Sequence, residues 1–469
     1  MEEEFEFDFN KDAQNSIERY EEMIRNQDQY FFDAQAFEYI IDNYIEKNDP
    51  VKALQVVEYA LNQHPYAAVF LIKQAQLLLF TNEVDRAFAA LEKAEMLEAS
   101  EADIYVLRGN IYQNMDRHAE ALENYEKALT LAETTDEILL QIAYVYQNMH
   151  DYENAIVYIK RSLEQNMENK DGLYELAFCY DILDKQEESI QFYQEYIDSD
   201  PYSYAAWYNL ANSFHKLELY EKAIDAYQFA VVIDEKFDYA YRNMGDAYLR
   251  IRKYKEAIDA LEKVLELSRP EDVIYEAIGH CYHRLKNYAQ ARFHYKKAVH
   301  LNPDDSRLHQ KIASTYMLES KWQMAIKQIE HAIRINKHIN EYYIMMGECY
   351  MYLDDYKEAA TYFGIVVKHK PKQIAGWESF IKCLIANEQY DAALEQTELA
   401  YMSTQGKVIF VYYRSAILFM MHKRKEGLLQ LEMALSKSGK WLNKLIKFYP
   451  ELIQDPKVVE LISQYKKPR

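Results

Sequence analysis

The stretch AWYNLANSFHKLELYEKAIDAYQFA, residues 206–230, decides how the chain is organised, because its pattern returns after every 34 residues. One step later the chain reads AYRNMGDAYLRIRKYKEAIDALEKV at residues 240–264, and a further step gives IYEAIGHCYHRLKNYAQARFHYKKA at residues 274–298. Self-similarity at one fixed period is typical of repeat proteins, in which each copy packs against the next. The chain therefore reads as an array of 34-residue repeats.

Eleven consecutive repeats keep this register without an insertion when the first begins at Ala34. Position 8, counted from 1 within each repeat, is small in nine repeats, the exceptions being Ile41 and Ile381, and small residues let paired helices approach closely. Position 11 is aromatic in nine repeats. Proline ends one helix pair before the next at position 32 of four repeats: Pro65, Pro201, Pro303 and Pro371. Position 20 is alanine in ten repeats and serine in one: Ala53, Ala87, Ala121, Ala155, Ser189, Ala223, Ala257, Ala291, Ala325, Ala359 and Ala393.

The composition excludes several classes of protein. With only 10 Gly and 9 Pro in 469 residues, the chain has little material for hairpins or phosphate-binding loops, so it should be nearly all helix. A net charge of −22 repels nucleic acid and anionic lipid. The longest apolar run, residues 408–421, contains Arg414 and is too short to span a bilayer, and no secretory signal is recognisable. We therefore expect a cytoplasmic protein without membrane insertion.

The repeat pattern resembles the tetratricopeptide repeat (TPR) family over about residues 34–440, as about twelve tandem units. Repeat six carries the residues that match the family's signature positions: Trp207, Leu210, Ala211, Phe214, Ala223, Tyr227 and Ala230. The resemblance implies an all-α fold, an α-solenoid in which antiparallel pairs of a first helix (A) and a second helix (B) stack into a right-handed superhelix. It also implies a groove lined mainly by A helices. Such proteins bind other proteins and rarely catalyse, so we expect no enzyme.

Five segments are expected along the chain. They are an acidic N-terminal tail (1–12), an N-terminal capping helix (13–33), eleven TPR-like units (34–407), a degenerate twelfth unit (408–440), and C-terminal capping helices with a basic tail (441–469). In the twelfth unit, Tyr412 and Ala416 match the first helix and Gly427 and Leu431 the second. This alignment makes the turn between the two helices one residue shorter than in the other repeats.

The sequence GHCYH at residues 279–283 raises the question of a metal site. All four cysteines occupy position 10 of their repeats, where a free thiol behaves as a small hydrophobe: Cys179, Cys281, Cys349 and Cys383. His280 and His283 occupy positions 9 and 12, which lie on one helical face together with positions 2 and 5. Two imidazoles and Glu276 could hold a divalent cation. We interpret them instead as a polar part of the groove wall, with no metal and no cofactor.

Repeats six to nine are the candidate peptide-binding groove, because their A helices present aromatic, amide and basic side chains where other repeats present acids. The expected contacts are Tyr208, Asn209, Asn212, Tyr239, Arg242, Asn243, His280, His283 and Arg307. Position 13 adds a basic ladder of Lys216, Arg250 and Arg284, which could instead stabilise the C-terminal ends of the A helices. Arginine and amide groups favour acidic or free C-terminal peptide ligands.

Two functions remain open at this point. The favoured one is a scaffold or adaptor that binds extended or helical segments of partner proteins in the superhelical groove. The alternative is a structural subunit of a larger assembly, held by its convex face and its end caps. Constant co-purification with a stoichiometric partner would favour the second hypothesis.

Overall fold

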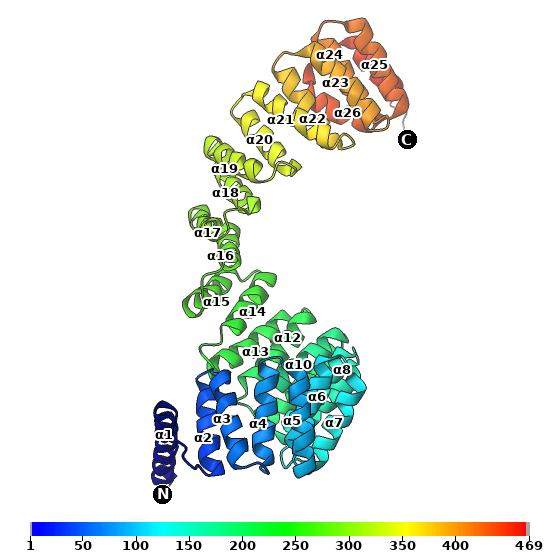
Figure 1. Cartoon of the computed structure of the whole chain (residues 1–469). Coiled ribbons are helices and arrows are strands. Elements are labelled where there is room, and N and C mark those ends of the chain that lie inside the picture. The colour runs from blue at the N-terminus through cyan, green and yellow to red at the C-terminus, as the bar shows by residue number, and fades with distance from the viewer. Residues whose placement is uncertain (1, 466–469) are drawn as a thin grey trace. The chain divides into compact units, whose positions relative to one another are not determined.

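A computed structural model describes residues 2–465, with side chains from residue 14 onward, and all regular elements among these residues are helices. The chain divides into two compact parts, Met1–Glu235 and Lys236–Arg469, each of which is considered by itself. The all-α solenoid of tandem helix pairs that the sequence predicts is confirmed (Figure 1). None of the described helices is long and apolar enough to cross a membrane.

The N-terminal part contains α1 and six helix pairs. Its helices are α1 (Glu2–Asn26), α2 (Ala34–Glu46), α3 (Pro50–Gln63), α4 (Ala68–Phe80), α5 (Val84–Leu97), α6 (Ala102–Asn114), α7 (His118–Leu131), α8 (Asp136–Asn148), α9 (Tyr152–Gln165), α10 (Lys170–Ile182), α11 (Gln186–Ser199), α12 (Tyr204–Lys216) and α13 (Tyr220–Ile233).

The C-terminal part contains six further pairs and the terminal helices. These are α14 (Asp238–Arg250), α15 (Tyr254–Leu267), α16 (Asp272–Arg284), α17 (Tyr288–Leu301), α18 (Ser306–Leu318), α19 (Trp322–Ile335), α20 (Asn340–Tyr352), α21 (Tyr356–His369), α22 (Ile374–Ala386), α23 (Tyr390–Ser403), α24 (Ile409–Met420), α25 (Arg424–Lys437), the 3-10 helix η1 (Gly439–Trp441), α26 (Leu442–Phe448), the 3-10 helix η2 (Pro450–Gln454) and α27 (Pro456–Tyr465).

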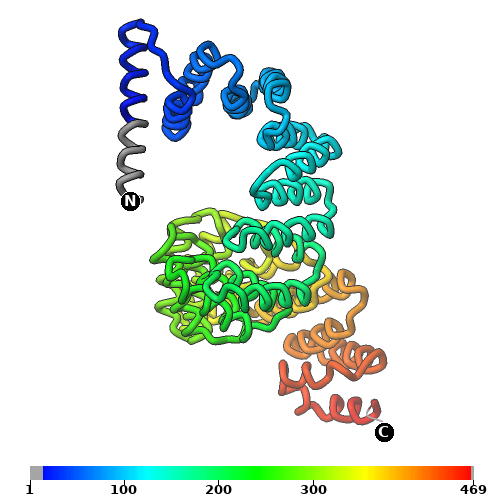
Figure 2. The backbone as a smooth tube through the Cα atoms, turned by 90° about the horizontal axis from the view of Figure 1, so that it is seen from below, coloured from blue at the N-terminus to red at the C-terminus, as the bar shows by residue number. Residues whose placement is uncertain are grey.

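The 34-residue register sets the helix bounds directly. In each of the eleven repeats the A helix has 13 residues and begins at position 1, and the B helix has 14 residues and begins at position 17. Side chains just before several A helices accept a hydrogen bond from the first turn, as Asp33, Ser203 and Asp305 do. Within each part, consecutive pairs then stack side by side along the chain (Figure 2).

A single non-glycine residue in the left-handed region makes every turn between helices A and B. It stands at position 15 with φ between 54° and 62° in all twelve repeats, and includes Asn48, Asp184, Arg252 and Lys286. The next residue, at position 16, is the N-cap of helix B, and in repeats one, four, eight and ten its side chain accepts a hydrogen bond from the first turn of that helix. The turn geometry is therefore fixed by the packing of the two helices rather than by glycine.

Positions 8 and 24 are matched in size. Where position 8 is glycine, position 24 is large: a Cβ on Gly279 would lie 2.6 Å from ring carbons of Tyr295, and one on Gly347 2.6 Å from Phe363. Where position 8 is isoleucine, position 24 is a smaller β-branched residue, Val57 after Ile41 and Thr397 after Ile381. This pairing explains why two repeats tolerate a large residue at a position that is otherwise small.

Ser189, the one exception to alanine at position 20, has a partner in the next repeat. Its hydroxyl lies 2.7 Å from that of Ser213, and both side chains are buried. The Ser213 hydroxyl is also 3.1 Å from the carbonyl oxygen of Asn209. Two buried hydroxyls that satisfy each other are thus tolerated where position 20 otherwise holds alanine.

The prediction of a shorter turn between the two helices of the twelfth repeat is wrong. His422 has φ 59° and α25 begins at Arg424, which are the 34-residue equivalents of Glu388 and Tyr390. Ser415 occupies position 8 in this register and is fully buried, and its hydroxyl donates to the carbonyl oxygen of Gly427 at position 20. Helix A begins one residue late instead, because residue 408 precedes α24 rather than starting it.

Helices cover both ends of the array. α1 runs from Glu2 to Asn26, so the segments expected as tail and cap share one helix, of which Tyr20 and Met23 are buried against the first repeat. Ile24, on the same helix, stays 45% exposed. At the other end, α26, η2 and α27 bury their apolar residues against α24 and α25. The apolar α24 is thereby shielded from water.

Candidate binding surface

The predicted contacts lie on four A helices in two compact parts. Tyr208, Asn209 and Asn212 are on α12 in the N-terminal part, and the others are on α14, α16 and α18 in the C-terminal part. We call positions 2, 5, 9 and 12 of the A helices the A-helix face. In the C-terminal part this face includes Tyr239, which is 60% exposed, and Arg307, whose side chain is 72% exposed.

Asn209 does not belong to the accessible surface. It is 1% exposed, and its Nδ2 donates to the carbonyl oxygen of Leu173 in the preceding A helix at 3.1 Å. The amide group that the sequence assigns to a ligand is thus used to join two repeats, and Asn209 is not part of the proposed binding surface. Asn212 is half-buried, and its Oδ1 accepts a 2.6 Å hydrogen bond from the Tyr227 hydroxyl. Asn243, which shares position 6 with Asn209, is half-buried.

Both arginines of the C-terminal part have carboxylate partners within the chain. The Arg242 guanidinium binds the Glu271 carboxylate through two hydrogen bonds of 2.6 and 3.0 Å, and this pairing raises the pKa of Arg242. Arg307 binds Asp305 through Nε at 3.0 Å and a terminal nitrogen at 2.9 Å. The sequence prediction missed these acids, although both stand at position 34, immediately before an A helix.

The two histidines of GHCYH share a positively charged environment. Loss of solvation, together with the charges of Lys311 and Arg284, lowers the pKa of both His280 and His283, so both are neutral at pH 7. Lys311 in turn makes an ion pair with Glu276. Cys281 is fully buried, and burial raises the pKa of its thiol to about 12. Within residues 14–465 no three His, Cys, Asp or Glu side chains come together as a metal site would require.

Each member of the basic ladder interacts with neighbouring residues. Lys216 pairs with Asp181 of the preceding repeat at 2.9 Å, and Arg250 pairs with Asp246 on its own helix at 3.2 Å. The Arg284 guanidinium lies 5.6 Å from the centre of the Tyr254 ring, in the preceding repeat. Two of the three therefore join successive repeats, which explains the 34-residue spacing of the ladder without a ligand.

Comparisons with known proteins identify the same repeat. Models described as "Tetratricopeptide repeat" match residues 102–134, 136–167, 171–203, 202–269, 273–305 and 341–368. No curated protein sequence matches the chain.

Several solved structures are similar to parts of the chain. The C-terminal part of a TPR repeat-containing protein from Cytophaga hutchinsonii is 16% identical, with a TM-score of 0.44, over 54% of this chain and 98% of that one. YrrB, described as a TPR protein with an unusual peptide-binding site, is 25% identical, with a TM-score of 0.30, over 39% and 95%. A chain of the APC/C hetero-tetramer Cut9–Hcn1 is 12% identical, with a TM-score of 0.32, over 82% and 89%.

Proposed function

The chain belongs to the tetratricopeptide repeat family, and from this premise we propose that it is a non-catalytic scaffold or adaptor for protein–protein interaction. Its ligand is an extended or helical segment of a partner protein, bound along the A-helix face. The ligand-facing residues of the C-terminal part are Tyr239, Arg242, His280, His283 and Arg307 on that face, with Asn243 beside it at position 6. Tyr208 and Asn212 are the corresponding residues of the N-terminal part.

The observation that supports this proposal is the exposure of aromatic, imidazole and basic groups on the same face of three consecutive A helices, α14, α16 and α18. Tyr239 on α14 offers a flat apolar surface, and Arg307 on α18 offers a guanidinium group, both at position 2. α16 lies between them in the chain and carries the two neutral histidines at positions 9 and 12. A bound peptide can contact such a row of side chains, because the peptide's own side chains recur at regular intervals.

We infer that the ligand is acidic or ends in a free carboxylate. The Arg242–Glu271 pair already has the bidentate geometry in which a guanidinium binds a carboxylate, so a ligand carboxylate can replace Glu271 without rearranging Arg242. Burial, and after it the charges of Lys311 and Arg284, lowers the pKa of His280 and His283, and these two cations also favour an anion nearby.

Reversing the charge of Arg242 and Arg307 should nearly abolish binding. The probe is the tightest peptide selected from a random library with free C termini, and its affinity for the parent and for the Arg242→Glu, Arg307→Glu variant is measured by fluorescence anisotropy at two salt concentrations. Each arginine that makes a desolvated contact contributes about 2 kcal/mol. Glu271→Gln should instead tighten binding, because it removes the carboxylate that competes for Arg242.

Arg334→Glu is the control for reversing one charge, because Arg334 is exposed on the B helix α19, and it is compared with Arg242→Glu and Arg307→Glu made singly. It should bind the probe like the parent protein. If all variants bind equally, or if the parent shows no dependence on salt, the A-helix face of the C-terminal part is not the binding surface.

A further inference from the structure

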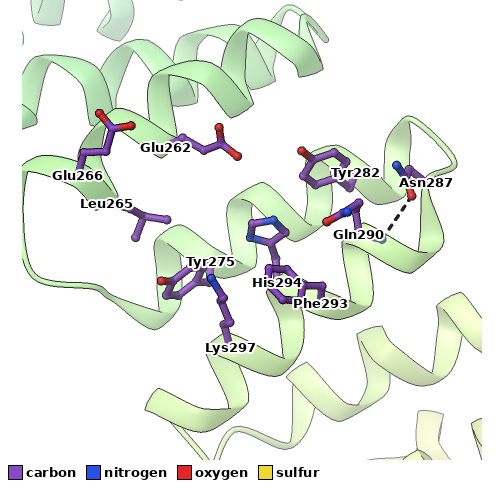
Figure 3. A pocket seen from close by; sticks show the side chains of 10 residues that line it. All are labelled: Glu262, Leu265, Glu266, Tyr275, Tyr282, Asn287, Gln290, Phe293, His294 and Lys297. Atoms are coloured by element: carbon purple, nitrogen blue, oxygen red, sulfur yellow. Dashed lines mark hydrogen bonds between the residues drawn. The ribbon is translucent and has the colours of Figure 1, made fainter.

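A second candidate site lies away from the A-helix face. A pocket of about 580 Å³ opens between α15, α16 and α17 in the C-terminal part (Figure 3). Glu262 reaches it from α15, Tyr275 and Tyr282 from α16, and Phe293, His294 and Lys297 from α17. In repeat numbering these are positions 25, 4, 11, 22, 23 and 26, none of which belongs to the A-helix face. The pocket is therefore lined by different residues from those of the A-helix face.

The pocket contains a buried polar atom without a partner. His294 is 7% exposed, its ring stacks on Tyr282 with centres 5.4 Å apart, and its Nδ1 has no hydrogen-bond partner within the protein. Leaving such a group unsatisfied costs stability, which makes it a marker for a missing ligand or water. Burial, and then the charge of Lys297, lowers the pKa of His294 to about 4, so the ring is neutral and does not repel a cation.

The equivalent positions in other repeats show that stacking alone does not require histidine. Tyr146 stacks on Tyr158 in repeat four, and Tyr350 on Tyr362 in repeat ten, at the same positions 11 and 23. Tyrosine thus serves the packing equally well. Histidine in repeat eight adds a ring nitrogen at a point where the other two repeats have an aromatic carbon.

The pocket already holds a cation at one end. The Lys297 Nζ lies 4.6 Å from the centre of the Phe293 ring and 5.0 Å from that of Tyr275, which are cation–π distances. Tyr282 lies at the other end of the pocket, where burial, and then the negative charges of Glu262 and Asp259, raises its pKa. These two carboxylates make the electrostatic potential at that end negative. Glu262 makes no ion pair with any residue that the structure describes, and Figure 3 shows its carboxylate pointing toward the side where Tyr282 and His294 lie.

We propose that this pocket binds the guanidinium group of an arginine side chain on a partner protein. The planar group would lie against the rings that line the pocket and donate hydrogen bonds to the Glu262 carboxylate and to Nδ1 of His294. The net charge of −22 attracts basic segments over a longer range. Since the A-helix face favours ligands of the opposite charge, this inference and the proposed function can fail separately.

The direct test compares N-acetyl-arginine amide with N-acetyl-citrulline amide, its neutral analogue of the same shape. Each compound is titrated into the full-length protein with ¹⁵N-labelled histidine, and the His294 ring signals, assigned with a His294→Phe variant, are followed by NMR. The arginine compound should shift these signals saturably and the citrulline compound should not. Equal shifts with both compounds, or none with arginine, would refute the proposal.

Two substitutions at the pocket should change the arginine affinity in opposite directions. Glu262→Gln removes the charged acceptor and should weaken binding about tenfold. Lys297→Met removes the internal competitor for the Phe293 and Tyr275 rings and should tighten binding about threefold. Glu256→Gln on α15 and Lys296→Met on α17 make the same charge changes at exposed sites outside the pocket and should leave the affinity unchanged. If the pocket variants behave like these controls, arginine binds elsewhere.

Discussion

Deleting residues 306–339, one complete repeat, should leave a folded helical protein, whereas deleting residues 306–322 should not. The first deletion removes α18 and α19 together and joins α17 to α20 in the register that every other repeat keeps. The second removes α18 but keeps most of α19, whose Ile326, Ile329 and Ala332 are buried. Without an A helix to cover them, these residues would face water, at a cost of about 2 kcal/mol for each large side chain.

Circular dichroism and urea unfolding distinguish the two deletions. The 34-residue deletion should keep the parent's helix content per residue and unfold cooperatively, because each repeat contacts only its neighbours. The 17-residue deletion should lose helix content and aggregate. A soluble, cooperatively folded 17-residue deletion would mean that the helix pair is not the structural unit of this chain.

Replacing Gly279 with isoleucine should lower the free energy of unfolding by about 3 kcal/mol. The new Cβ alone would lie 2.6 Å from two ring carbons of Tyr295, which is 2% exposed and packed on all sides. Gly364→Ile is the matched control within a helix, because the nearest atom to its Cβ, on Phe380, is 3.6 Å away. The control should change stability by less than about 1 kcal/mol, since isoleucine is a better helix former than glycine.

A second substitution tests whether positions 8 and 24 are coupled. Repeat eleven combines Ile381 with Thr397, so Gly279→Ile together with Tyr295→Thr reproduces a pair that the chain already contains. The double variant should be more stable than Gly279→Ile alone, as measured by urea unfolding in a double-mutant cycle. Strictly additive losses would show that the two positions do not share one space.

The succession of helix pairs could be predicted from the sequence, because eleven repeats without insertions keep one 34-residue register. What the sequence could not show is how the turns are made. The residue at position 15 adopts a left-handed conformation that glycine favours, yet it is arginine at 252 and lysine at 286. These residues hold a costly backbone conformation because the two helices that they connect are packed together.

The A-helix face could be predicted less well, because helical periodicity says which side chains share a face but not what they contact in the next repeat. Asn209 is buried by the preceding A helix, and Arg242 and Arg307 are paired with acids at position 34, outside the face. The pocket around His294 could not be recognised from the sequence, because an aromatic ring at position 23 also serves packing alone, as Tyr158 and Tyr362 show.

Site-specific photo-crosslinking in cells tests most directly whether the A-helix face is where this scaffold binds its partners. A photoreactive phenylalanine analogue is placed at Tyr239 on α14 or, in a second variant, at Met324 on the B helix α19, where the side chain is 44% exposed. We expect a discrete protein adduct at position 239 that disappears when Arg242→Glu and Arg307→Glu are added, and none at position 324. Adducts at position 324 alone, or an adduct at position 239 that the arginine substitutions do not change, would contradict the proposed binding surface.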